Sequence, residues 1–170
     1  MKRLVFCGID LAAKEKNPTG AVCIDIKARV IEEGLLFSDH DILNFIRRNK
    51  PKVIAIDAPL SLPVTGNLRE EERLLLSQGH KIFPFFESMT ILANRGIHLD
   101  NEICKIFKSS TVIEVCPSVS AKILGIEREK NKVKRHLEDA RIAAITAKMF
   151  YEGDCILVSG RFFMPRKEKN

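Results

Sequence analysis

Three aspartates that lie far apart in the chain are placed where carboxylates can act together. Asp10 ends an apolar run over 4–9, Asp57 ends a similar run over 53–56, and Asp139 lies in a helix predicted near the end of the chain. Neighbouring carboxylates repel and raise one another's pKa values, and Mg²⁺ or Mn²⁺ relieves that repulsion by taking oxygen ligands. Ions held in this way activate water for attack on a phosphodiester. The three residues therefore predict a catalytic and metal-binding cluster.

The two apolar runs are typical of central strands buried on both faces, because they are too short for helices and rich in β-branched residues. A small residue, Gly8 or Ala55, stands two positions before each aspartate. Strand side chains alternate between faces, so each small residue shares a face with its aspartate. We expect parallel neighbouring strands whose carboxylates meet at one sheet edge, beside a shallow patch.

The segments between the two runs predict the topology. Residues 20–26 and 29–36 have the pattern of two strands joined by a tight connection, so the first three strands should form an antiparallel meander. A helix over 38–50, closed by Pro51, then allows the Asp57 strand to run parallel to the first. The sequence predicts an α/β fold with a mixed sheet, a three-stranded meander followed by parallel strands, and helices on both faces.

A block of about fifty residues, 60–110, is too long for a plain connection and predicts a helical insertion or lid. We expect a helix over 68–78 capped by Asn67, and a second over 87–108 with a break near Gly96. The aromatic cluster 83–86 could stack bases or pack the insertion onto the core.

The last helix is predicted over 136–152, with Asp139 at the centre of its inward face. Glu138 lies on the flank of that face and is a further candidate metal ligand. Small residues let the helix approach the sheet closely, so that Asp139 can reach the patch beside the other two aspartates. They are the alanines at 140, 143, 144 and 147.

Length and composition predict one domain over 1–170, with a loose basic tail over 165–170. No run of membrane-spanning length interrupts the chain, so we expect a cytoplasmic protein without a membrane partner. The five cysteines lack C-x-x-C spacing and fit reduced thiols better than a zinc site. A net charge of +6 is compatible with a polyanionic partner such as nucleic acid.

Several basic residues are candidate substrate contacts. Arg69 and Arg73, four apart in a predicted helix, could clamp a phosphate or belong to a salt-bridged surface. Lys14 follows the first aspartate, and the basic run 130–136 precedes the third. Within that run Lys134 and His136 could contact phosphates, and His136 could also transfer protons.

Glu114 is a further candidate metal ligand, because it lies in an otherwise apolar strand over 111–116. A buried glutamate at such a position is either paired with an arginine or lysine or belongs to the metal site. The sequence leaves these two alternatives open.

Several segments together resemble the uncharacterised domain family 429, whose members are predicted nucleases of RNase H-like fold related to RuvC-type resolvases. They are 8–12 (Gly-Ile-Asp-Leu-Ala), 56–60 (Ile-Asp-Ala-Pro-Leu), the helix with Arg69 and Arg73, 113–117 (Ile-Glu-Val-Cys-Pro) and 138–140 (Glu-Asp-Ala). The resemblance spans nearly the whole chain. It implies an RNase H-like fold and an acidic site at Asp10, Asp57 and Asp139.

Three functions remain open at this stage. The first is a metal-dependent nuclease that hydrolyses phosphodiester bonds of DNA or RNA. The second is a single-domain relative of the actin/hexokinase-type ATPases or phosphotransferases, which share an aspartate on the first strand but normally have two domains and glycine-rich phosphate loops. The third is a non-catalytic nucleic-acid-binding module of the same fold. The sequence does not decide whether the chain forms a homodimer.

Overall fold

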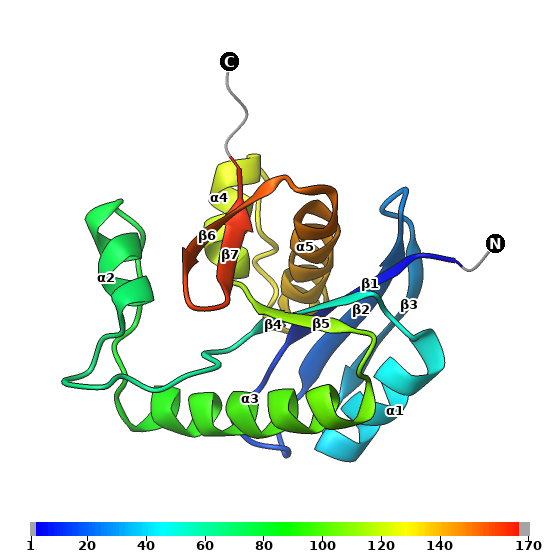
Figure 1. Cartoon of the computed structure of the whole chain (residues 1–170), viewed down its shortest axis with the longest axis horizontal. Coiled ribbons are helices and arrows are strands. Elements are labelled where there is room, and N and C mark those ends of the chain that lie inside the picture. Colours follow the sequence, from blue (N-terminus) through cyan, green and yellow to red (C-terminus); the bar gives the residue numbers. More distant parts are fainter. Residues whose placement is uncertain (1–2, 167–170) are drawn as a thin grey trace.

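Within residues 3–166, which the computed structural model describes, one mixed sheet of seven strands carries helices on both faces (Figure 1). The strand order is β3-β2-β1-β4-β5-β7-β6. The strands are β1 Val5–Asp10, β2 Thr19–Asp25, β3 Val30–Leu36, β4 Val53–Asp57, β5 Thr111–Glu114, β6 Cys155–Ser159 and β7 Phe162–Pro165. The helices are α1 Asp39–Asn49, α2 Glu70–Ser77, α3 Glu87–Ile106, α4 Pro117–Leu124 and α5 Lys132–Glu152.

The predicted strand directions are confirmed. The first three strands, β1, β2 and β3, form an antiparallel meander, and β4 pairs with β1 in parallel. The register places Gly8 beside Ala55 and Asp10 beside Asp57. The protein is therefore an α/β protein with a mixed sheet, in which the ends of two central parallel strands bring two aspartates together.

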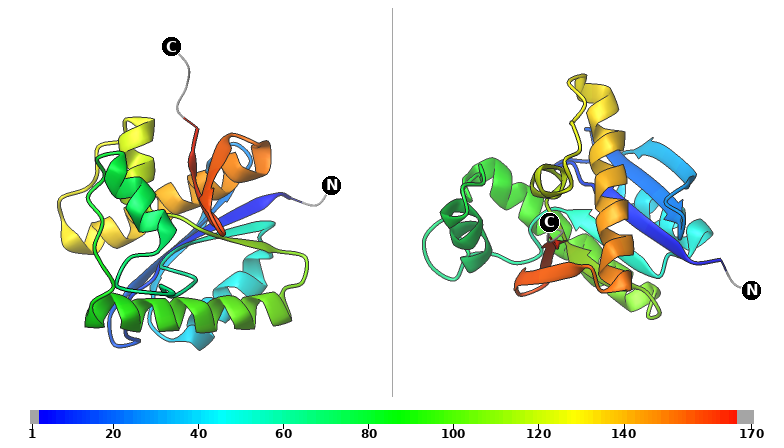
Figure 2. Two further views of the ribbon diagram at one scale, coloured as in Figure 1. Left: turned by 60° about the vertical axis from the view of Figure 1, so that its left-hand side comes forward. Right: turned by 90° about the horizontal axis from the view of Figure 1, so that it is seen from above.

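Two hydrophobic cores lie on opposite faces of the sheet. On one face α1 and α3 pack against the side chains of alternate strand residues, including Ile9 and Ile56. On the other face α5 crosses the strands, and its alanines pack against Phe6, Val22 and Ala55 (Figure 2). Since Asp10 and Asp57 follow Gly8 and Ala55 by two positions, both aspartates belong to the α5 face.

Helix α5 lies unusually close to the sheet because glycines face it. A Cβ atom added to Gly8 would lie 2.0 Å from the carbonyl oxygen of Ala140, and one added to Gly20 would lie 2.0 Å from that of His136. Small residues on both partners thus allow direct contact between helix and strand backbones. This close packing carries Asp139, one residue before Ala140, to the end of β1.

Two predicted helix starts and one predicted helix break are wrong. Helix α5 begins at Lys132 and not at 136, because the side chain of Asn131 accepts hydrogen bonds from the first turn. Helix α2 begins at Glu70, with Arg69 and not Asn67 at its N-cap. Helix α3 is continuous at Gly96, where a Cβ would lie 2.9 Å from the carbonyl oxygen of Pro59. That glycine serves close packing and not a break in the helix.

The end of the chain forms a hairpin that the sequence analysis does not predict. Strands β6 and β7 pair with each other, and β7 joins β5 through Glu114 and Phe162. Phe162 and Met164 pack with Leu75 and Val119 in a small third core. Pro165 belongs to β7 and the backbone of Arg166 donates to Asp154, so the predicted loose tail is wrong for these two residues. Its residues 167–170 lie outside the described part of the chain.

Arg161, in the turn of this hairpin, forms an ion pair with the buried carboxylate of Asp100 on α3. The hairpin is therefore attached both to the sheet and to the insertion over 60–110. Among residues 3–166 no helix is long and apolar enough to cross a membrane.

Candidate active site

The three aspartates predicted to act together converge at one edge of the sheet. Asp10 and Asp57 end neighbouring strands and line a cavity of about 410 Å³. Asp139 approaches from α5, on the face that packs against these strands, and is buried. Strand register determines the positions of the first two carboxylates, and the close docking of α5 determines the third.

The electrostatics of the cluster reflect this proximity. Burial raises the pKa of Asp57 well above its usual value, and the negative charges of Asp10 and Asp139 raise it further. Burial also raises the pKa of Asp10, which His136 partly opposes and the charge of Asp139 reinforces. Three carboxylates that act on one another in this way form a site whose negative charge is incompletely compensated.

The side chains of Arg128 and His136 contact two carboxylates of the cluster. The guanidinium of Arg128 donates to both carboxylate oxygens of Asp139, at 2.9 and 2.5 Å. The Nδ1 atom of His136 lies 2.6 Å from Oδ2 of Asp10. Within residues 3–166, no cation lies within ion-pair distance of Asp57. Asp57 is therefore the carboxylate of the cluster that depends most on a ligand for charge compensation.

The donor chemistry of the cluster suits a hard divalent cation, since three carboxylates offer the oxygen ligands that Mg²⁺ and Mn²⁺ prefer. In this structure, however, no group of three or more His, Cys, Asp or Glu side chains in residues 3–166 is arranged to hold a metal ion. Metal binding through Asp139 requires Arg128 to release both of its carboxylate oxygens, whereas His136 contacts one oxygen of Asp10.

Glu114 lines the same cavity as Asp10 and Asp57, but it is one half of a buried ion pair. Its carboxylate accepts two hydrogen bonds from Arg69, at 2.9 and 2.5 Å, and one from the backbone of Leu60. Arg69 also donates to Glu72 and is 5% exposed. Of the two alternatives left open for Glu114, pairing with an arginine is therefore the one observed. Arg69 lines the same cavity as Asp10 and Asp57, but protein carboxylates occupy its guanidinium, which favours the salt-bridged alternative over the phosphate clamp.

The remaining predicted ligands lie outside the cluster. The carboxylate of Glu138 accepts a hydrogen bond from the backbone of Glu129, and Glu138 lines a different hollow from Asp10 and Asp57. Lys14, Arg73 and Lys134 are exposed, and none of them lines the acidic cavity. Lys14 instead lines a separate hollow beside the start of α3.

Arg128 is the residue of the site that the sequence analysis misses. It belongs to a charged loop without periodicity, so no pattern indicates which way its side chain points. Arg135 also lines the cavity, and its guanidinium donates to the carbonyl oxygen of Glu129 at 2.8 Å. Two arginines therefore stand beside the carboxylates, at positions suited to contact the oxygens of a phosphate.

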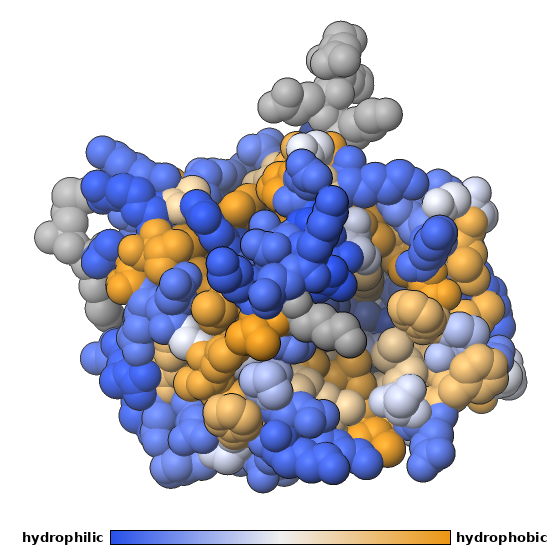
Figure 3. Space-filling model, turned by 180° about the vertical axis from the view of Figure 1, so that it is seen from behind, coloured by the Kyte–Doolittle hydropathy of each residue, from blue (hydrophilic) through white to orange (hydrophobic). Residues whose placement is uncertain are grey.

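The 60–110 insertion adds apolar side chains to the lining of the cavity, beside the charged Arg69, Glu72 and Lys81. The apolar side chains include Phe83, Phe85, Met89 and Leu92. The ring of Phe83 is 75% exposed, which is unusual for phenylalanine. From behind, Figure 3 shows exposed hydrophobic residues gathered in patches between hydrophilic ones. The cavity thus combines carboxylates, arginines and exposed aromatic rings.

Fold and site together define an α/β protein with an acidic cavity at the edge of a mixed sheet. A search against models of known protein families found no match to this chain, and a search of curated protein sequences found none either.

Proposed function

We propose that this chain is a metal-dependent nuclease of RNase H-like fold that hydrolyses phosphodiester bonds of DNA or RNA. The observation that carries the proposal is that Asp10 and Asp57 line one cavity and the buried Asp139 lies close enough behind them for its charge to act on both, so that burial and the other two carboxylates raise the pKa of Asp57. The strand order β3-β2-β1-β4-β5, with a meander followed by parallel strands, supports the fold assignment. The sequence segments that resemble the uncharacterised domain family 429 support both the fold assignment and the nuclease activity.

The three aspartates would hold Mg²⁺ or Mn²⁺, which when bound supplies charge neutralisation and activation of water. Arg128 and Arg135 contact the phosphate oxygens of the substrate and orient the scissile bond. In this proposal Arg128 pairs with Asp139 before substrate binds and with a phosphate oxygen afterwards. His136 orients the carboxylate of Asp10 through its hydrogen bond.

Two features favour a nuclease over an ATPase or phosphotransferase of the actin/hexokinase type. The loop over 11–18 contains no glycine, whereas such enzymes bind phosphates with glycine-rich loops. The next glycine, Gly20, lies directly under the carbonyl oxygen of His136 and serves helix packing.

The second candidate is a non-catalytic nucleic-acid-binding module. It is favoured by one observation, the ion pair that Arg128 forms with Asp139. A module that never binds metal can keep this pair permanently. Cleavage and binding assays on the same variants separate the two candidates.

A metal titration followed by thermal denaturation is the first test. At about 100 times its dissociation constant, Mn²⁺ stabilises a protein by about 2.7 kcal/mol, which for this chain length corresponds to roughly 5–10 °C in Tm. We expect that rise in the wild type and the loss of most of it in Asp57→Asn. Asp25→Asn is the matched control, because Asp25 lies at the opposite end of the meander, beside Val5. An equal rise in wild type and Asp57→Asn would count against the metal site.

Cleavage of a panel of labelled nucleic acids is the second test. The panel contains single-stranded, duplex, hybrid and branched substrates, each incubated with and without Mn²⁺. We expect metal-dependent cleavage of at least one substrate, lost in Asp57→Asn and kept in Asp25→Asn. Binding without cleavage, unaffected by Asp57→Asn, would instead support the non-catalytic module.

A further inference from the structure

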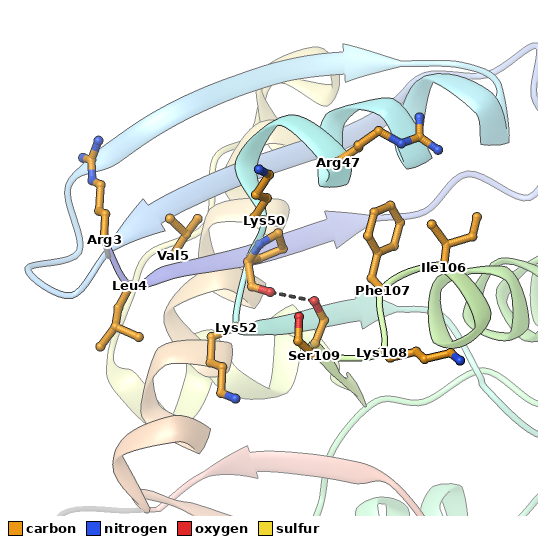
Figure 4. Close-up of a pocket in the computed structure, with 12 residues that line it drawn as sticks. Arg3, Leu4, Val5, Arg47, Lys50, Lys52, Ile106, Phe107, Lys108 and Ser109 are labelled. Carbon is orange, nitrogen blue, oxygen red and sulfur yellow. Dashed lines mark hydrogen bonds between the residues drawn. The ribbon is translucent and has the colours of Figure 1, made fainter. Parts of the chain in front are cut away.

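A second and larger cavity lies at the opposite edge of the sheet, where β1 and β4 begin (Figure 4). Its volume is about 640 Å³, and it shares no lining residue with the acidic cavity. Four segments form it: the residues before and at the start of β1, the end of α1, the start of β4 and the turn between α3 and β5. The length of β4, about 13 Å from Val53 to Asp57, separates the two cavities.

The charge of this cavity is one-sided. Its lining includes five cationic residues and no aspartate or glutamate. The cationic residues are Arg3, Arg47, Lys50, Lys52 and Lys108. Among residues 3–166, no carboxylate lies within ion-pair distance of the three lysines, all of which are exposed. Such a cluster attracts anions, and especially anions with several charges.

Ordinary helix electrostatics explain only part of this charge. Helices α1 and α3 both end at the cavity, and each C-terminus carries about −0.5 of an elementary charge. Together the two ends offset about one positive charge. Arg3 is partly neutralised by Asp25, which lies 3.6 Å away. About three of the five positive charges therefore remain uncompensated by the helix ends and Asp25.

The rest of the lining is apolar or carries hydroxyl groups. Leu4 is 36% exposed and Ile106 is 44% exposed. The ring of Phe107 stands beside Ile106 (Figure 4), and the guanidinium of Arg47 lies 6.0 Å from its centroid. Ser109 is exposed in the turn that follows. An inorganic anion would use the cations alone, whereas a ligand with a planar apolar part would use this wall as well.

We propose that this cavity binds a nucleoside triphosphate, with its base against Phe107 and the neighbouring apolar side chains. Its phosphates would bind Lys50, Lys52 and Lys108, whose flexible side chains point in different directions in Figure 4 and would turn toward the ligand. The volume falls within the range of about 300–1,000 Å³ that is typical of small-molecule sites. Lysines bind phosphates as point charges, and an aromatic ring beside cations is suited to stack a base. The site is independent of the acidic cavity and of the function proposed for it.

Isothermal titration calorimetry on the full chain, without divalent metal, tests this proposal with three probes. They are ATP, inorganic tripolyphosphate and adenosine. We expect saturable binding of ATP at one site, at least fivefold weaker binding of tripolyphosphate, and much weaker binding of adenosine. Equal affinity for ATP and tripolyphosphate would overturn the role of the apolar wall. Absence of saturable ATP binding up to millimolar concentration would overturn the site.

Variants locate the binding. We expect Lys52→Glu and Lys108→Glu each to weaken ATP binding about tenfold, while Phe107→Leu weakens ATP but leaves tripolyphosphate unchanged. Lys14→Glu is the matched control, because it makes the same charge change on an exposed loop at the other edge of the sheet. A tenfold loss in this control as well would show that net charge, and not the cavity, governs binding. Circular dichroism of each variant establishes that it is folded.

Discussion

Replacing Gly8 by alanine should separate helix α5 from the centre of the sheet. The added Cβ would lie 2.0 Å from the carbonyl oxygen of Ala140, 2.3 Å from the backbone nitrogen of Ala144 and 2.9 Å from the carbonyl carbon of Ala143. All three atoms belong to helix backbone, so no side chain can rotate away. To move the first contact from 2.0 Å to an ordinary 3.4 Å, the helix must retreat by roughly 1.4 Å.

The size of the effect follows from this displacement. Overpacking a core destabilises a protein by about 1–3 kcal/mol, and rigid backbone neighbours place this substitution at the upper end. A loss of about 3 kcal/mol corresponds to a decrease of roughly 6–12 °C in Tm for a chain of this length. Asp139 precedes Ala140 and moves with it. Because misplacement by about 1 Å can cost about a hundredfold in rate, the proposed nuclease activity should fall at least that far.

Differential scanning calorimetry measures the stability of this variant, and Mn²⁺-dependent cleavage below its Tm measures its activity. Gly34→Ala on β3 is the matched control, because the nearest atom to its added Cβ lies 4.0 Å away. We expect the control to change Tm by less than about 2 °C. A Gly8→Ala protein as stable as Gly34→Ala would refute the close packing of α5. A destabilised variant with full activity would refute its role in positioning Asp139.

Three further substitutions test other parts of the structure. Glu114→Gln should destabilise the protein by about 3 kcal/mol, measured by urea denaturation, since it breaks a buried ion pair with Arg69; a loss below 1 kcal/mol would contradict the pairing. Arg29 lowers the pKa of Asp25 to about 2, below its unfolded value of about 3.9, so this carboxylate contributes stability above pH 4 that disappears as the pH falls to 2. The Tm difference between wild type and Asp25→Asn should therefore be present at pH 6 and absent near pH 2, and a constant difference would contradict this reasoning. Asn131→Ala should destabilise the protein by about 1 kcal/mol by removing a helix cap. No change in stability would contradict this cap and favour the helix start predicted at 136.

Much of the acidic cluster could be predicted from the sequence, because its positions depend on strong local patterns. Two apolar runs each end in an aspartate, and the segments between them leave few ways to pair the strands. Asp139 could be placed on the inward face of its helix although the predicted start was four residues late. The angular position of a residue depends on helical periodicity and not on where the helix begins.

The features that could not be predicted depend on long-range contacts. The ion pair between Glu114 and Arg69 spans forty-five residues, and nothing near either residue indicates the other. Arg128 lies in a loop whose course is determined by the helix that follows it. The β6–β7 hairpin could not be predicted because no residue of β6 is fully buried and the strand shows no clean alternation of apolar and polar residues.

The C-terminal hairpin, by contrast, contributes no carboxylate to the cavity. All three aspartates and the whole of α5 precede Gly153, so a chain truncated there would retain every acidic group of the site. It would also leave Leu75 and Val119 without Phe162 and Met164, each of which contributes about 1.5–3 kcal/mol when buried. The last two strands therefore stabilise the fold without supplying acidic groups to the site. Removing them would first reduce resistance to heat and proteases, while the three aspartates would remain in the chain.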